Sequence, residues 1–272
     1  MSFCIELFCV VTLQYQILVR IAIAYFIIEK KKAAPQPWQA IAQRFCSIGS
    51  WWRSESMEKQ EYIEEVNLIK EQNDTEFEIY PMAVEIIRPT IKNLSKRYVF
   101  ARRKTDKGQI YYGISSFPDV AILDKKFKNI SNKTISEEVW HQLKGCLEVK
   151  ALETKLIAKD QIEEVLSTKP DKLKKEIGQL IGEILWYKKV LYTNGVEWRC
   201  LYINEYSEEL IKRIIGMVNE RIDSEKENPN KDFDWWEKFK DIEFKIVDEC
   251  ITKNCIENWD DFIAKIHKIN WE

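Results

Sequence analysis

The stretch KGCLEVKAL, residues 144 to 152, sets an acidic and a basic side chain inside a short apolar run. A run of this length and composition is typical of a buried strand. Successive side chains of a strand point to opposite faces, so Glu148 and Lys150 share one face and the apolar residues between and beside them take the other. Such a pair is either part of a chemical site or an ion pair on an edge strand, worth about 0 to 1 kcal/mol; taken alone, it favours the ion pair.

A second acid begins the nearest strand-like apolar segment upstream. In PDVAIL, residues 118 to 123, Asp119 follows a proline at the entrance of the strand, where the plain alternative is a simple strand start. If this strand pairs with the one that carries Glu148, the two carboxylates converge. Together with the backbone carbonyl of Val149 and water, these oxygen ligands suit Mg²⁺ or Mn²⁺. The metal would activate a bound water, which Lys150 would orient or deprotonate.

This order of residues, Pro118-Asp119 and then Glu148-Val149-Lys150, resembles the PD-(D/E)XK nuclease superfamily. The later run GQLIGEILWYKKVLYTNGVEWRCLYI is similar to a region of the N-terminal nuclease domain of type I restriction enzyme R subunits and of their stand-alone relatives. The resemblance covers roughly residues 75 to 205. The matching residues of that run are Gln179, Tyr187, Thr193, Asn194, Gly195 and Trp198.

The resemblance implies that Asp119, Glu148 and Lys150 form the catalytic trio and that Gln179 contacts the active site; taken alone, Gln179 reads as an ordinary solvated helix residue. The family often spaces its glutamine and tyrosine four residues apart, but Glu183 takes that place here, so Tyr187 is carried over only weakly. The family also places an acid on the helix before the first strand. Glu78 and Glu85 both qualify, and Glu85 is favoured as the additional acid because it lies inside the expected helix.

The expected fold is therefore α/β and restriction-endonuclease-like, with a central mixed sheet flanked by helices. Strands are expected within residues 98–123, 145–152 and 191–203, including a hairpin that pairs 98–101 with GQIYYGI, residues 108–114. Helices are expected at 81–97 and 173–190. Asn194-Gly195 is the strongest hairpin signal in the chain.

Charge is distributed unevenly along the sequence. The net charge is −2, so any attraction for nucleic acid must come from local clustering. Residues 92–133 carry eleven basic residues against three acids, which is either a solvated face or a surface that tracks a phosphate backbone. The candidate nucleic-acid contacts are Arg102, Arg103, Lys104, Lys125 and Lys126, with DNA favoured over RNA.

Three regions are expected along the 272 residues. Residues 1–56 form an apolar extension and linker that is expected to be dispensable; polar residues within its apolar part argue against a membrane span. Residues 57–224 form the nuclease-like domain. Residues 225–272 form a helical, tryptophan-rich tail that could bind a protein partner or a second copy of the chain.

Cysteine and histidine usage excludes several classes of protein. The seven cysteines include no CxxC pair, which predicts neither a disulfide framework nor a zinc site and favours a cytoplasmic location. The two histidines make a histidine-dependent triad improbable. The sequence thus predicts a metal-dependent endonuclease, as in restriction or defence. The alternative is a non-catalytic nucleic-acid-binding or assembly module on the same fold.

Overall fold

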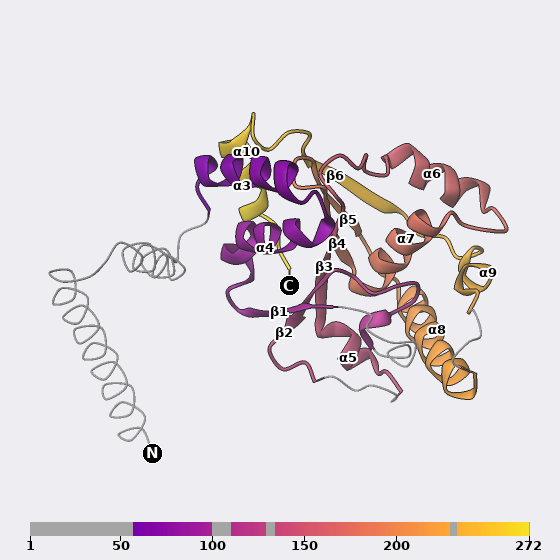
Figure 1. Cartoon of the computed structure of the whole chain (residues 1–272). Coiled ribbons are helices and arrows are strands. Elements are labelled where there is room, and N and C mark those ends of the chain that lie inside the picture. Colours follow the sequence, from indigo (N-terminus) through magenta and orange to yellow (C-terminus); the bar gives the residue numbers. More distant parts are fainter. Residues whose placement is uncertain (1–56, 100–109, 129–133, 229–232, 272) are drawn as a thin grey trace, which may run out of the picture. The chain divides into compact units, whose positions relative to one another are not determined.

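A computed structural model describes residues 57–99, 110–128, 134–228 and 233–271. Its centre is a six-stranded sheet in the order β1-β2-β3-β4-β5-β6, in which β3 and β4 are parallel and all other neighbours are antiparallel (Figure 1). The expected α/β fold with a mixed sheet flanked by helices is confirmed. The strands are β1 Leu94–Tyr98, β2 Val120–Asp124, β3 Leu143–Val149, β4 Lys189–Thr193, β5 Trp198–Ile203 and β6 Ile246–Thr252.

Helices cover both faces of this sheet (Figure 1). One face packs against α3 Lys59–Gln72, α4 Glu76–Ile87 and α10 Trp259–His267. The other packs against α5 Glu137–His141, α6 Lys159–Thr168, α7 Lys175–Tyr187, α8 Glu208–Glu227 and α9 Trp235–Phe239. Two short 3₁₀ helices, η2 Arg88–Ile91 and η4 Ile110–Tyr112, complete the described elements.

The central strands are buried on both faces, and their side chains alternate between two cores. Ala121 of β2 and Cys146 of β3 belong to the core on the α7 side, whereas Val120 and Leu147 belong to the core on the α4 side. Strands covered on both faces carry nearly continuous apolar residues. A charged residue in such a strand therefore lies inside the protein, and Glu148 is only 2 % exposed.

Helix α7 packs tightly against the segment that leads into β2. All of its residues from position 180 to its last residue are buried, and the indole of Trp186 donates to the Ile110 carbonyl at 2.8 Å. A Cβ on Gly182 would lie 2.1 Å from the Ser115 hydroxyl oxygen, so only glycine permits this approach. The same hydroxyl donates to the Gln179 carbonyl at 3.0 Å.

Two expected elements in the first half of the chain are wrong. Residues 110–112 form the 3₁₀ helix η4, and the strand that pairs with β1 is β2. The helix expected over 81–97 is α4, which ends at Ile87; the chain then forms η2 and the strand β1. Pro89 contributes to the ending, because it has no backbone N–H to continue the α-helical hydrogen bonds, while Arg88 before it keeps helical dihedrals and begins η2.

The segment 225–272 is not the expected helical tail. Its strand β6 pairs with β5. Helix α8 crosses the expected boundary after position 224 and ends at Glu227. Arg199 of β5 binds Asp248 of β6 with two nitrogens, which compensates the charges of this buried pair. Residues 56–272 form one compact unit.

No helix within the described ranges is long and apolar enough to cross a lipid bilayer. The extension expected at residues 1–56 lies outside the described residues.

Candidate active site

Asp119 and Glu148 lie opposite each other at the end of neighbouring strands. In the antiparallel pair β2–β3, Val120 stands opposite Leu147, and one further step in this register places Asp119 opposite Glu148. Directly opposed residues have their Cβ atoms about 4.5 to 5.5 Å apart. Their strands pair as neighbours, so the two carboxylates are brought together.

Asp119 is held by two donors. The Tyr80 hydroxyl, from helix α4, donates to Oδ1. The backbone N–H of Val149 donates to Oδ2 at 2.6 Å. These contacts orient the Asp119 carboxylate toward β3. Val149 thus contacts the cluster through its backbone N–H.

Lys150 forms the basic part of the cluster. Its Nζ lies 2.5 Å from Glu148 Oε1 and 3.9 Å from Oε1 of Glu76 in the first turn of α4. The Lys150 side chain is 18 % exposed and that of Glu148 is 3 % exposed, so the ammonium lies between a buried acid and the surface. The backbone N–H of Lys150 donates to the Thr193 carbonyl, which fixes the residue after β3 ends.

Gln179 joins Glu148 to a further buried acid. Its side-chain nitrogen donates to Glu148 Oε1 at 2.9 Å and to Glu183 Oε1 at 3.1 Å. Gln179 and Glu183 lie four residues apart on α7 and so face the same side of the helix. Glu183 is 1 % exposed.

Burial is the main cause of the altered acidity in this cluster. Burial raises the pKa of Asp119 to about 6, although the hydrogen bonds from Tyr80 and Val149 oppose the shift. Burial, followed by the charge of Asp119, raises the pKa of Glu148 to about 8. Burial and the two neighbouring acids also raise the pKa of Glu183 well above its ordinary value.

The pKa of Lys150 shifts upward, which keeps its ammonium charged. Burial alone would lower its pKa, but Glu148, Glu76 and Asp119 together raise the pKa above the ordinary lysine value. The ammonium therefore keeps its proton near neutral pH. It is suited to binding an anionic group, and less suited to taking a proton from water.

The buried acids fit a hard divalent cation. Oε2 of Glu148 and Oε2 of Glu183 are buried without a hydrogen-bond partner, and a buried carboxylate oxygen ordinarily has one. Oxygen donors of this kind are the ligands that Mg²⁺ and Mn²⁺ prefer. Across the described ranges no three Asp, Glu, His or Cys side chains form a complete cage, so water or substrate oxygens would fill the remaining positions.

The structure separates several other sequence candidates from this cluster. Glu85 forms an ion pair with Arg88, and Glu78 accepts from Asn73 at 2.9 Å, whereas Glu76 lies 3.9 Å from the Lys150 ammonium. Glu76 is thus an acid of α4 that reaches this cluster. The Tyr187 hydroxyl donates to the Tyr111 carbonyl at 2.6 Å within the core, which gives it a structural role.

The basic candidates lie elsewhere or outside the described residues. Lys125 and Lys126 are exposed and follow the end of β2 that is remote from Asp119. At about 3.4 Å per residue the two ends of this five-residue strand are roughly 14 Å apart. These lysines therefore do not line the carboxylate cluster. Arg102, Arg103 and Lys104 lie outside the described residues.

Sequence reasoning missed Tyr80, Glu76 and Glu183 as parts of the site. Tyr80 and Glu76 come from α4, far from the trio in sequence, and only the packing of α4 on the sheet brings them close. Glu183 did carry a signal, because it lies four residues after Gln179. Its role becomes visible only where the buried amide bridges it to Glu148.

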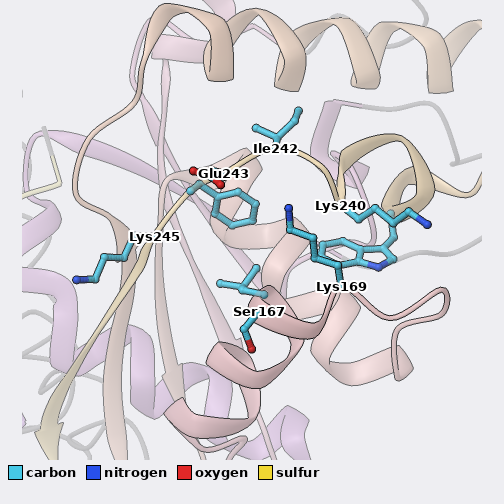
Figure 2. A pocket seen from close by; sticks show the side chains of 9 residues that line it. Ser167, Lys169, Lys240, Ile242, Glu243 and Lys245 are labelled. Atoms are coloured by element: carbon cyan, nitrogen blue, oxygen red, sulfur yellow. The ribbon is translucent and has the colours of Figure 1, made fainter.

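A separate pocket of about 530 Å³ lies between α6, α9 and the segment before β6 (Figure 2). It shares no lining residue with the carboxylate cluster. Lys240, one of its cations, is already paired with Glu237 at 2.8 Å and Asp171 at 3.6 Å. The Trp236 indole also donates its N–H to the Pro170 carbonyl. Two of the polar groups that line this pocket, the Lys240 ammonium and the Trp236 indole, are thus engaged by the protein itself.

Comparisons of this chain with protein-family models, with curated proteins and with solved structures find no match.

Proposed function

We propose that this protein is a Mg²⁺- or Mn²⁺-dependent endonuclease of the PD-(D/E)XK type, acting on DNA in the cytoplasm. The observation that carries the proposal is the meeting of Asp119, Glu148 and Lys150 at one end of the β2–β3 pair. An acid pair with one permanently charged lysine suits hydrolysis of a phosphodiester, whose transition state gathers negative charge. The mixed sheet between two helical layers is compatible with this class of enzyme.

Each residue has a distinct role in this proposal. Asp119 and Glu148, with the Val149 carbonyl, would hold the cation, which supplies Lewis acidity and lowers the pKa of a bound water. Lys150 binds the scissile phosphate and stabilises the charge that develops on its oxygens. Gln179 fixes the rotamer of Glu148 through its 2.9 Å hydrogen bond, and Tyr80 fixes that of Asp119.

The decisive test is plasmid cleavage by the full chain with Mg²⁺. We expect Asp119→Ala and Lys150→Ala to lower the rate by about 10²-fold or more, the scale of a lost charge-stabilising group. Lys212→Ala is the matched control, because this lysine is 73 % exposed on α8 and is not among the candidate nucleic-acid contacts. It should cleave like the wild type.

Two results would separate the alternatives. Equal rates for the wild type and for Lys150→Ala would contradict the proposed site. DNA binding by the wild type without any cleavage in Mg²⁺ or Mn²⁺ would favour the non-catalytic binding module.

A further inference from the structure

An exposed lysine at the start of α7 lies on the same side of this helix as the residues that join the carboxylate cluster. Lys175 is the first residue of α7, and Gln179 follows it by four positions. Residues four apart on a helix have their Cβ atoms about 5 to 6 Å from each other. Lys175 is exposed, Gln179 is half-buried and Glu183 is buried, so this side of α7 leads from the surface to the two acids that Gln179 bridges.

A second exposed lysine, Lys155, lies in the segment that follows β3, and this segment is fixed to the sheet on both sides of the lysine. The Asn194 amide donates to the carbonyl of the residue before Lys155 at 3.0 Å. The backbone N–H of Ile157 donates to the Tyr192 hydroxyl at 3.3 Å. Tyr192 is the partner of Glu148 in the parallel pair β3–β4. Lys155 is therefore an exposed cation on an anchored segment at the same end of the sheet as the cluster.

Neither lysine is neutralised by an acid within the described part of the chain. No described carboxylate forms an ion pair with Lys155 or Lys175, and the nearby Glu153 is paired with Lys70 at 3.5 Å. Glu176, the residue after Lys175, lies about 100° further round α7 and so faces another side of the helix. The two ammonium groups are thus open to an anion from solution.

The position of these lysines differs from that of the basic residues that the sequence suggested as nucleic-acid contacts. Lys125 and Lys126 follow the end of β2 that is remote from Asp119. Lys155 follows the end of β3 that enters the cluster, and Lys175 lies one helical turn from the glutamine that joins it. Of these two pairs, only Lys155 and Lys175 lie at the end of the sheet where the scissile phosphate would be bound.

We propose that Lys155 and Lys175 bind backbone phosphates of a DNA duplex near the scissile one, so that the duplex lies across this end of the sheet. The inference rests on the proposed nuclease function and adds the surface that receives the substrate. Phosphate contacts position a nucleic acid without reading its sequence, so these lysines should bind unrelated sequences equally. Each lysine that neutralises a phosphate also releases counterions, which makes the affinity fall as salt rises.

The salt dependence of duplex binding tests the inference. Fluorescence anisotropy of a short labelled blunt duplex is measured with the full chain between about 50 and 200 mM salt, without a divalent cation so that no cleavage occurs. We expect the double variant Lys155→Ala, Lys175→Ala to lower the slope of log affinity against log salt by about 2, roughly one for each lost phosphate contact. Its affinity should fall by the same factor for duplexes of unrelated sequence. Arginine at both positions should keep the wild-type slope.

A charge-matched control removes two exposed cations near the start of α8. Strand β5 leads into α8 and ends beside Lys189, at the end of β4 remote from the cluster. The double variant Lys212→Ala, Arg213→Ala should therefore keep the wild-type slope.

An unchanged slope for the variant at 155 and 175 would overturn the inference, and so would a wild type that does not bind the duplex at about 50 mM salt. A lowered slope for Lys125→Ala, Lys126→Ala alone would place the DNA at the other end of β2. Plasmid cleavage is scored separately. A wild type that binds with the expected slope but never cleaves counts against the proposed function, whereas cleavage with an unchanged slope at 155 and 175 counts against this surface alone.

Discussion

At the scale of single residues, one amide group organises two buried acids. The Gln179 nitrogen donates to Glu148 and to Glu183, and each acid retains one buried oxygen without a partner. Such an arrangement stores unfavourable charge in the absence of a cation or a proton. The protonation of Glu183 should therefore be visible in the stability of the protein.

We expect Glu183→Gln to weaken the fall in stability that accompanies rising pH. Burial, Glu148 and Asp119 raise the pKa of Glu183 in the folded chain. A raised pKa stabilises the fold fully below the ordinary carboxylate pKa, and that contribution is lost as pH rises through the folded value. Glutamine does not titrate, so its variant lacks this loss.

Denaturant unfolding of wild type and variant between pH 5 and 9 measures the effect. Glu208→Gln is the control, because the side chain of Glu208 is 92 % exposed. Parallel pH profiles of stability for the wild type and Glu183→Gln would contradict a raised pKa of Glu183 in the folded chain.

At the scale of elements, the position of α7 decides where Gln179 points. Gly182 allows the helix to approach Ser115, whose hydroxyl binds the Gln179 carbonyl. A displacement of α7 would therefore move the amide away from Glu148. A second helical glycine, Gly216 in α8, offers a matched comparison, because a Cβ added there would meet no atom within 4 Å.

We expect opposite effects from alanine at these two glycines. Gly182→Ala forces α7 or Ser115 to shift, because its Cβ would lie 2.1 Å from the hydroxyl oxygen; overpacking of this kind typically costs about 1 to 3 kcal/mol. Gly216→Ala should stabilise by roughly 0.5 to 1 kcal/mol through helix propensity. Urea unfolding and plasmid cleavage measure both. A Gly182→Ala variant with wild-type stability and rate would contradict the role given to this contact.

Elements whose pattern is local could be predicted from sequence. The alternation around Glu148 predicted β3 and the shared face with Lys150, and Asn194-Gly195 predicted the β4–β5 hairpin. Strand β6 could not be predicted, because its centre carries Asp248 and Glu249 and reads as a polar surface. Asp248 becomes buried only through its pairing with Arg199 on another strand.

At the scale of the whole molecule, stability and metal affinity should be linked through protons. The pKa of Asp119 is raised to about 6 and that of Glu148 to about 8, so protons compete with a cation for these oxygens. We expect Mg²⁺ affinity to rise between pH 6 and pH 8 and to be largest above it. Calorimetric titration at several pH values, in buffers of different ionisation enthalpy, measures affinity and proton release together.

The same linkage predicts how stability changes with pH. Without a divalent cation the free energy of unfolding should fall as pH rises from about 4 through 8, because both carboxylates bind protons more tightly in the folded chain. Saturating Mg²⁺ should remove most of this fall. A pH-independent Mg²⁺ affinity would contradict the metal role of Glu148.

A residue near the end of the described ranges covers part of one face of the sheet at β3. Trp271 is 3 % exposed, its indole donates to Thr90 at 2.9 Å, and it packs so closely on β3 that a Cβ at Gly145 would lie 2.5 Å from its ring. We expect Trp271→Ala to lower the free energy of unfolding by about 3 to 5 kcal/mol, as for other buried aromatic truncations. Denaturant unfolding checks this, with the exposed-site substitution Lys268→Ala as control. A loss below about 1 kcal/mol would show that this segment contributes little.

The late position of Trp271 relative to the trio has a consequence during synthesis. The strands that carry Asp119 and Glu148 leave the ribosome long before β6 and Trp271 do, so the nascent chain holds its acidic cluster in an unfinished sheet. The sheet is complete only after β6 and Trp271 have been synthesised. Translation products that stop before β6 lack both the edge strand that pairs with β5 and the indole that covers Gly145, so they should be less stable than the full chain.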